Sequence, residues 1–142
     1  MSSLAYIGLG SNLGNRLSNL QKAKSSLLAN PRIKLKAKSS ILETKPVDYL
    51  PQNFFLNQVL KIKTDYSPLD LLENLQQIEI QMGRTKTISK GPRIIDLDIL
   101  LYDKIVYNST DLNIPHPEIM KRKFIIDHIL EIDPRAFSSA LE

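Results

Sequence analysis

The sequence predicts an α+β sandwich in which helices pack on an antiparallel sheet, and three observations lead to this prediction. Short apolar runs that suit strands and longer patterns that suit helices follow one another in the order strand, helix, strand, strand, helix, strand. Proline, glycine, asparagine and serine separate these segments, as expected for turns and helix caps. With 142 residues, 42% of them hydrophobic and 24% charged, the chain can bury one core, and we expect one domain over residues 1–142.

The first half of the chain is expected to form two strands around a helix. Residues 4–9 are a short apolar run that suits a buried strand, and residues 10–15 suit a turn. Residues 16–28 suit a helix, and the second strand is expected within residues 33–42. The apolar stripe of this helix is expected to contain Leu17, Leu20, Leu27 and Leu28.

The glycine-rich segment from Gly8 to Gly14 does not match a nucleotide-binding loop. A dinucleotide-binding fingerprint would need a third glycine at position 13, where this chain has Leu13. A P-loop would follow Gly14 with lysine and then serine or threonine, which the chain lacks here. We therefore interpret the segment as a tight turn.

The second half supplies another strand, a helix and a strand. Residues 44–51 suit a loop and residues 54–63 the third strand. Ser67 is the expected N-cap of a helix with Pro68 at its first position, and Gly83 is the expected stop. Its apolar stripe is expected to contain Leu72, Leu75, Ile78 and Met82.

The last third of the chain completes the sheet and adds helical material. Residues 94–102 suit the fourth strand, residues 103–104 a tight turn and residues 105–107 a short strand. Helical sequence follows the prolines after residue 114 and continues to about residue 132. The whole order is that of a ferredoxin-like sandwich with an antiparallel sheet and extra C-terminal helical elements.

Two acids stand in the predicted fourth strand. Asp96 and Asp98 are two residues apart, so their side chains project from one face, about 7 Å apart along the chain. The two carboxylates repel each other unless a cation lies between them, and carboxylates without nearby Cys or His suit Mg²⁺. An edge strand with two solvated aspartates is the alternative, but Asp is depleted in strands, which favours a site. The opposite face is expected to pack into the core through Ile95, Leu97, Ile99 and Leu101.

Polar and basic residues precede this strand. Gln76 and Glu79 are three apart on the second helix and are either a solvated edge or part of a site. A run of basic residues is usually a solvated face, but this one leads directly to the carboxylate pair, and Arg and Lys beside Mg²⁺ suit phosphoryl-type transfer. We favour function for Arg84 and Arg93 and leave Lys86 and Lys90 open. The basic run consists of Arg84, Lys86, Lys90 and Arg93.

The aromatic and histidine residues could each bind a ligand or have a purely structural role. Phe55 and Asn57 share a face of the third strand, where they either grip a flat heterocycle or simply pack, and spacing alone favours packing. His116 lies between two prolines in a loop, and His128 lies in the last helix. Because the two histidines match no helical metal-ligand spacing, a zinc site is not expected, and His128 is expected to be structural.

Composition limits the environment and the ligand. The net charge of +4 and the pI near 9.3 fit an anionic ligand without choosing among nucleic acid, nucleotide and phosphate. The absence of cysteine excludes disulfides and thiolate metal sites within the sequence. The first residues lack the basic segment and long apolar run of a signal peptide, so we expect a cytoplasmic protein without a membrane partner.

Together these segments resemble one family, the 6-hydroxymethyl-7,8-dihydropterin pyrophosphokinases of folate biosynthesis. The Gly91-Pro92-Arg93-x-x-Asp96-Leu97-Asp98 stretch is the most specific match. The other matches, in family order, are Gly8-Leu9-Gly10-Ser11-Asn12-Leu13-Gly14, Phe55-Leu56-Asn57, Gln76 to Glu79 with Gly83-Arg84, Pro115-His116-Pro117 and Arg122-x-Phe124. The resemblance implies a monomeric enzyme that moves diphosphate from ATP to the pterin hydroxymethyl group and releases AMP.

The resemblance also implies roles for individual residues. Two Mg²⁺ ions would bind Asp96 and Asp98, and the catalytic set would be Arg84, Arg93, Asp96 and Asp98. ATP would contact Gln76, Glu79, Arg84, Lys86, Arg93, Ile99, His116 and Arg122. The pterin would contact Thr44, Val47, Phe55, Asn57, Asp96 and Phe124, with the two aromatic rings on either side of it.

Two residues depart from the family pattern, and two other functions compete with this one. Lys86 stands where arginine is frequent, and Asp111 stands where a basic residue can help to hold the nucleotide. An RNA-binding module shares the element order and the basic charge, but it needs exposed aromatics in an RNP1-like strand, which the sequence lacks. An inactive homologue that binds only nucleotide is disfavoured by the aspartate pair and both loop arginines.

Overall fold

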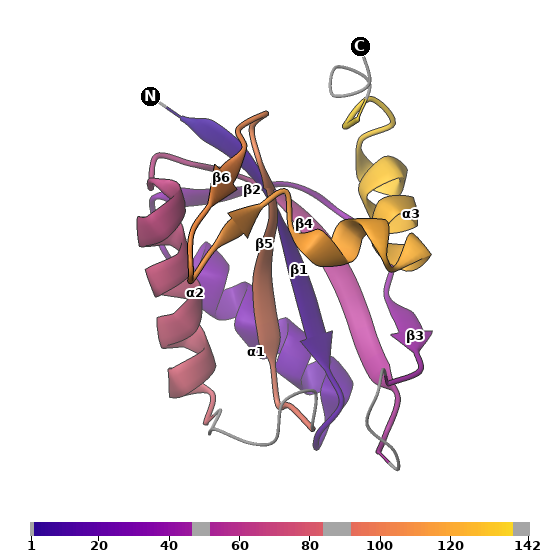
Figure 1. Cartoon of the computed structure of the whole chain (residues 1–142). Coiled ribbons are helices and arrows are strands. Elements are labelled where there is room, and N and C mark those ends of the chain that lie inside the picture. Colours follow the sequence, from indigo (N-terminus) through magenta and orange to yellow (C-terminus); the bar gives the residue numbers. More distant parts are fainter. Residues whose placement is uncertain (1, 47–51, 84–91, 138–142) are drawn as a thin grey trace.

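One antiparallel sheet organises the protein, with the strand order β2-β4-β1-β5 and with β3 paired to β4 (Figure 1). The computed structural model describes residues 2–46, 52–83 and 92–137. The strands are β1 (Ser3–Ser11), β2 (Ile33–Lys38), β3 (Leu42–Thr44), β4 (Phe55–Thr64) and β5 (Asp96–Tyr102). Because β1 pairs with β4 and β5 on its two sides, the predicted ferredoxin-like arrangement is confirmed.

Two capped helices cover one face of this sheet. Helix α1 (Arg16–Leu28) begins at Asn15, whose side chain accepts a hydrogen bond from the Ser18 N–H. Helix α2 (Pro68–Gln81) begins at Ser67, whose hydroxyl accepts from the Asp70 N–H. Gly83 follows α2 with φ of 89°, which glycine adopts without steric cost, and the predicted C-terminal cap is confirmed.

The larger apolar core lies between these helices and the sheet. It joins Ile7 of β1, Leu60 of β4 and Ile99 of β5 to Leu27 of α1 and Leu75 of α2, each at most 2% exposed. Burying such side chains is the main favourable term in folding, and the residues come from every major element of the helix-covered face.

The predicted stripe of α1 is wrong at Leu17, which is 46% exposed. The predicted Leu20 and Leu27 are buried on the sheet, and Ala23, which was not predicted, is buried with them. At 100° per residue, these three point in a common direction that is about 90° away from Leu17. Leu27 therefore lies nearest the centre of the buried face, with Leu20 and Ala23 on either side of it.

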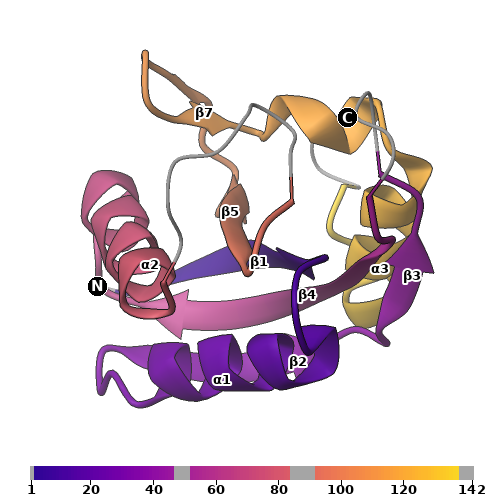
Figure 2. The ribbon, with the colours of Figure 1, turned by 90° about the horizontal axis from the view of Figure 1, so that it is seen from below.

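A second, smaller core lies on the other face of the sheet. Figure 2 shows α1 on one side of β1 and β4, with the helical turn before α3 on the other side. The 3-10 helix η1 (Pro117–Met120) and helix α3 (Lys123–Ile132) bring Ile119, Ile125 and Ile129 onto this face. The extra C-terminal helical elements predicted from the sequence are thus present, and they cover only part of the face.

A bulge in β5 changes which residues reach each core. Tyr6 of β1 pairs with Leu101, and Ile7 pairs with Ile99, so Leu100 is an extra residue in β5. A bulge reverses the alternation of faces beyond it. Leu101 therefore packs in the second core, and the prediction that it shares the face of Ile95, Leu97 and Ile99 is wrong.

After β5 the chain forms a small separate hairpin. Strand β6 (Tyr107–Asn108) pairs with β7 (Asn113–Ile114), and the Ser109 N–H donates to the Leu112 carbonyl. The predicted strand at residues 105–107 is wrong for its first two residues, because within the described residues no strand pairs with them; Val106 is 74% exposed. In the described part of the chain, no helix has the length and apolar character needed to cross a membrane.

We expect Leu71→Ala to lower the free energy of unfolding by about 2–5 kcal/mol, because the fully buried side chain would leave a cavity. Leu69→Ala is the matched control: it lies in the same helix and is 48% exposed, so a change within about 0.5 kcal/mol is expected. Urea denaturation measures both changes. Equal losses in the two variants would contradict the assignment of the buried face of α2.

Candidate functional site

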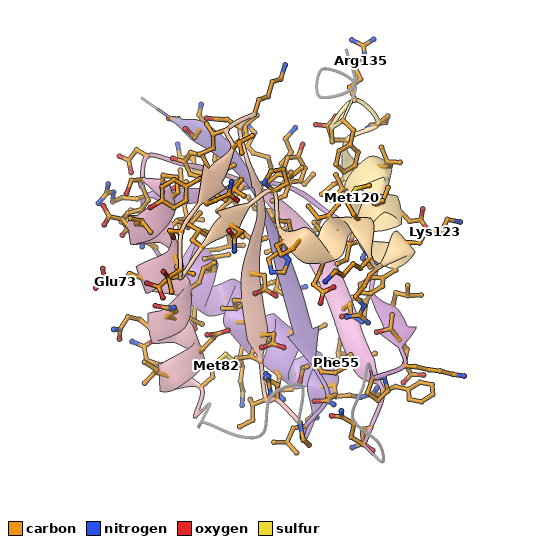
Figure 3. The ribbon with its side chains drawn as sticks, in the orientation of Figure 1. Phe55, Glu73, Met82, Met120, Lys123 and Arg135 are labelled. Carbon is orange, nitrogen blue, oxygen red and sulfur yellow. The ribbon has the colours of Figure 1, made fainter. Side chains whose placement is uncertain are left out.

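A pocket opens on the sheet face that the C-terminal helices leave uncovered. Its floor is formed by β1, β4 and β5, and its wall by the segment around η1 and the start of α3. Figure 3 shows Phe55 at the lower end of the sheet, near the end of β1. The predicted site residues that line the pocket are Phe55, Asn57, Asp96, Asp98, His116, Arg122 and Phe124.

Two glycines in β1 leave the floor of this pocket without side chains at their positions. Gly8 lies in register between Asp98 and Val59, and Gly10 lies between Asp96 and Asn57. A Cβ atom at Gly10 would stand 3.3 Å from Asn57 Oδ1, and one at Gly8 would stand 3.4 Å from Leu100. The central strand therefore leaves open the space between the acids and the amide.

This arrangement corrects the interpretation of the glycine-rich segment as a turn. Gly8 lies in β1 as the strand over residues 4–9 predicted, but β1 also includes Gly10 and Ser11, so the turn begins later than residue 10. The two glycines alternate with bulky residues, so they share one face of a strand. That period-two spacing was a readable signal for a close approach of a ligand to the backbone, and it was missed.

The carboxylate pair projects as the sequence predicts. Leu97 is 4% exposed toward the helix-covered core, while the side chains of Asp96 and Asp98 are 31% and 53% exposed toward the pocket. Arg93 Nε lies 3.2 Å from Asp96 Oδ1, and His116 Nε2 lies 3.8 Å from Asp98 Oδ1. Each acid thus has a nitrogen-bearing side chain close to one of its oxygens.

Helix α2 holds the backbone between the two acids. Glu79 Oε2 accepts a hydrogen bond of 2.9 Å from the Leu97 N–H. Because β5 is the edge of the sheet in the part of the chain that the structure describes, no strand there accepts its outward N–H groups. The Glu79 carboxylate takes that place, and it fixes the strand at the residue that separates Asp96 from Asp98.

His116 is oriented by the start of η1. Its Nδ1 accepts a hydrogen bond of 3.1 Å from the Glu118 N–H, so in the neutral ring the proton is on Nε2, which faces Asp98. Burial lowers the pKa of His116 below its usual value, and the nearby Glu118 carboxylate acts in the opposite direction. The ring can therefore offer an N–H toward the acids near neutral pH without carrying a full charge.

The opposite side of the pocket is aromatic and polar. Asn57 is 8% exposed and its Nδ2 donates to Thr44 Oγ1 at 2.7 Å, which fixes the amide beside Gly10. Thr44 belongs to β3 and pairs with Phe55, so the prediction that it begins a loop is wrong. The Arg122 guanidinium carbon lies 4.6 Å from the centre of the Phe124 ring, a cation–π distance.

Other predicted site residues lie away from the pocket wall. Gln76 is exposed on α2, and the Ile99 side chain is 2% exposed in the helix-covered core, on the opposite face from Asp98. Glu79 and Arg93 reach the site through Leu97 and Asp96, as described above. Val47, Arg84, Lys86 and Lys90 lie outside the described residues.

The acidic side chains at the pocket can be compared with the ligands that Mg²⁺ prefers. Across residues 2–46, 52–83 and 92–137, no three His, Cys, Asp or Glu side chains gather as a metal site. The two aspartates present hard oxygen atoms on one face, open to the pocket. Since Mg²⁺ keeps several waters and binds through one or two carboxylates plus substrate phosphates, the pair fits this ion.

An antiparallel ferredoxin-like sheet with acids, basic groups and aromatic rings around one pocket defines the class: a candidate transferase of phosphate-containing groups. The chain belongs to the 7,8-dihydro-6-hydroxymethylpterin-pyrophosphokinase (HPPK) family, whose model matches residues 6–134. The resemblance inferred from the sequence is therefore confirmed.

Curated relatives agree with this family, and a solved structure agrees with the fold. The chain is 42% identical over 132 residues to the 2-amino-4-hydroxy-6-hydroxymethyldihydropteridine pyrophosphokinase of Bacillus subtilis, covering 93% of this chain and 79% of that protein. It is 44% identical over 133 residues to the folic acid synthesis protein fol1 of Schizosaccharomyces pombe, covering 94% of this chain but only 18% of that protein. The fold is similar to the crystal structure of Plasmodium falciparum HPPK-DHPS with pteroate, with a TM-score of 0.75 and 15% identity over 94% of this chain and 39% of that chain.

We expect Glu79→Ala to destabilise the protein by about 1–3 kcal/mol, because it leaves the buried Leu97 N–H without its acceptor. Glu79→Gln is the control, since its side-chain carbonyl can still accept the bond and less of the stability should be lost. Thermal or urea unfolding of the two variants measures the difference. Indistinguishable unfolding of Glu79→Ala and wild-type protein would contradict this role.

Proposed function

We propose that this chain transfers diphosphate from ATP to the hydroxymethyl group of 6-hydroxymethyl-7,8-dihydropterin, the reaction named for its family, in folate biosynthesis. The observation that carries the proposal is a single pocket that faces two carboxylates on one side and an aromatic ring with a fixed amide on the other. The family match over residues 6–134 supports the same reaction. Residues 1–142 act as one pterin pyrophosphokinase domain in this proposal.

The aromatic side of the pocket suits the pterin. Phe55 and Phe124 both line the pocket, where aromatic rings can stack on a flat heterocycle, and Asn57 can hydrogen bond its edge. Because Thr44 holds the Asn57 amide in place, this recognition costs little side-chain ordering on binding. The backbone near Val47 belongs to the pterin site in the same proposal.

The basic side suits the polyphosphate of ATP. Arg93 and His116 lie near the acids, and Arg122 lines the same pocket beside Phe124. Arg84, Lys86 and Gln76 are proposed to contact the nucleotide as well. Glu79 and the backbone at Ile99 complete the proposed ATP contacts. Lys86 supplies a point charge rather than the two-pronged contact of an arginine, so its hold on a phosphate is less directional.

The reaction is an in-line displacement. The pterin hydroxymethyl oxygen forms a bond to the β-phosphorus of ATP, the bond between that phosphorus and the bridging oxygen to the α-phosphate breaks, and AMP leaves while the hydroxyl proton is released. Two Mg²⁺ ions held by Asp96 and Asp98 would supply neutralisation of phosphate charge at this site. The chain itself holds the two substrates in register, and this positioning lowers the entropic cost of the encounter.

The same proposal also states the binding partners, the oligomeric state and the cellular location of the enzyme. Both partners are small molecules, and the pair of carboxylates on the open sheet face would repel the backbone of an RNA. We propose a cytoplasmic monomer that binds neither nucleic acid nor membrane.

Product analysis tests the reaction directly. The protein mixed with ATP, Mg²⁺ and 6-hydroxymethyl-7,8-dihydropterin is expected to form AMP, and only when the pterin and Mg²⁺ are both present. Separation of AMP from ADP by ion-exchange chromatography makes the measurement. ADP as the product, or no turnover by folded protein, would refute the proposed transfer.

The aspartates are expected to serve activity rather than stability. Asp96→Ala and Asp98→Ala should each lower kcat by at least about 100-fold, because charge stabilisation is a large part of phosphoryl-type catalysis. Neither should lower the unfolding midpoint, since both side chains are partly exposed and removing one relieves repulsion. Asp127→Ala, an exposed acid on α3, is the control and should keep wild-type turnover. Full activity of either site variant would remove the basis for the metal assignment.

A further inference from the structure

Asn12 is a buried polar residue to which neither the sequence interpretation nor the proposed reaction gives a role. It follows β1 directly and is 1% exposed, although its side chain carries both a donor and an acceptor. A buried amide is costly unless its hydrogen bonds are made, so the partners of Asn12 reveal what it holds.

The carbonyl end of Asn12 holds Arg93. Asn12 Oδ1 accepts a hydrogen bond of 2.7 Å from the Arg93 N–H, and the Asn12 N–H donates to the Arg93 carbonyl at 3.0 Å. Both backbone groups of Arg93 are thereby fixed by one residue. Since Arg93 Nε lies 3.2 Å from Asp96, this bond pair sets the position of the guanidinium beside the carboxylate pair.

The amide end of Asn12 holds the segment before β4. Asn12 Nδ2 donates to Gln52 Oε1 at 2.6 Å and to the Asn53 carbonyl at 3.1 Å. Two residues later the chain reaches Phe55, which lines the aromatic side of the pocket. One side chain therefore connects the aromatic side to the basic side.

The turn around Asn12 does not need these bonds for its own shape. Asn19 of α1 donates from Nδ2 to Ser11 Oγ at 3.1 Å and to the Leu13 carbonyl at 2.7 Å, and these contacts flank Asn12 on both sides. The Asn12 side chain is consequently directed at the two neighbouring segments, 81 and 40 residues away along the chain.

We propose that Asn12 is a positioning residue that holds Arg93 and the segment before Phe55 at a fixed separation, so that the phosphate and pterin sides of the pocket are in register. This proposal rests on the proposed function. Small displacements of the two sides relative to each other would reduce turnover, because in-line displacement requires aligned reacting atoms.

Three variants test the proposal. Asn12→Ala is expected to lower kcat by roughly 10- to 100-fold, the effect of a displacement on the order of 1 Å. Gln52→Ala removes one of the two acceptors of Nδ2 and keeps the Arg93 bonds, so the KM for pterin should rise while the KM for ATP stays unchanged. Asn30→Ala is the matched control: Asn30 Oδ1 accepts from the Arg32 N–H and its Nδ2 donates to Tyr66 Oη, far from the site, so kcat should stay unchanged.

A readout without turnover separates positioning from a loss of folding. Amide hydrogen exchange at Arg93 should become faster in Asn12→Ala and stay at the wild-type rate in Gln52→Ala, because only the first variant removes the acceptor of that N–H. If Asn12→Ala does not fold, the KM split of Gln52→Ala decides the question.

The outcomes distinguish this proposal from the proposed function. Wild-type protein that makes no AMP refutes the function, and the positioning role falls with it. Active wild-type protein with unchanged kinetics in both Asn12→Ala and Gln52→Ala refutes the positioning role alone. A loss of kcat in Asn30→Ala equal to that in Asn12→Ala would assign the effect to general destabilisation and also overturn the proposal.

Discussion

The alternation of side chains along β5 is the constraint on which the rest of the structure depends. Leu97 and Ile99 are buried against the helices, so Asp96 and Asp98 must face the other way. Two like charges two residues apart are unfavourable in a strand, and a strand at the sheet edge with open hydrogen-bonding groups is unfavourable as well. The core on one face, the Glu79 carboxylate at the edge and the nitrogen-bearing side chains near the acids offset these costs.

The division of the second sheet face into core and pocket follows from the same strand. Beyond the bulge at Leu100, β5 turns Leu101 toward the C-terminal helices, where it packs with Tyr6 and Ile129. Before the bulge, the face presents acids that cannot be buried without a partner. The helices therefore cover the apolar part only, and Gly8 and Gly10 on the neighbouring strand keep the remainder open.

The geometry also separates the proposed enzyme from an RNA-binding module with the same element order. Such a module presents exposed aromatic rings on its sheet face, whereas here the corresponding surface carries two carboxylates beside glycines. The aromatic rings lie at the margin of the pocket, on β4 and at the start of α3, which suits one flat ligand held at the side of the acids.

The sequence by itself determined the two helices, the cap at Ser67 and the aspartate face, because these depend on local periodicity and on caps that act within a few residues. It also carried the family motifs, several residues of which line one pocket in the structure. Only the tertiary structure decided the faces of Leu17 and Leu101, since one depends on where α1 meets the sheet and the other on a bulge between β1 and β5. Likewise, the proposed role of Asn12 depends on hydrogen-bond partners 40 and 81 residues away along the chain. These contacts exist only once the sheet has formed, so no local sequence pattern predicts them.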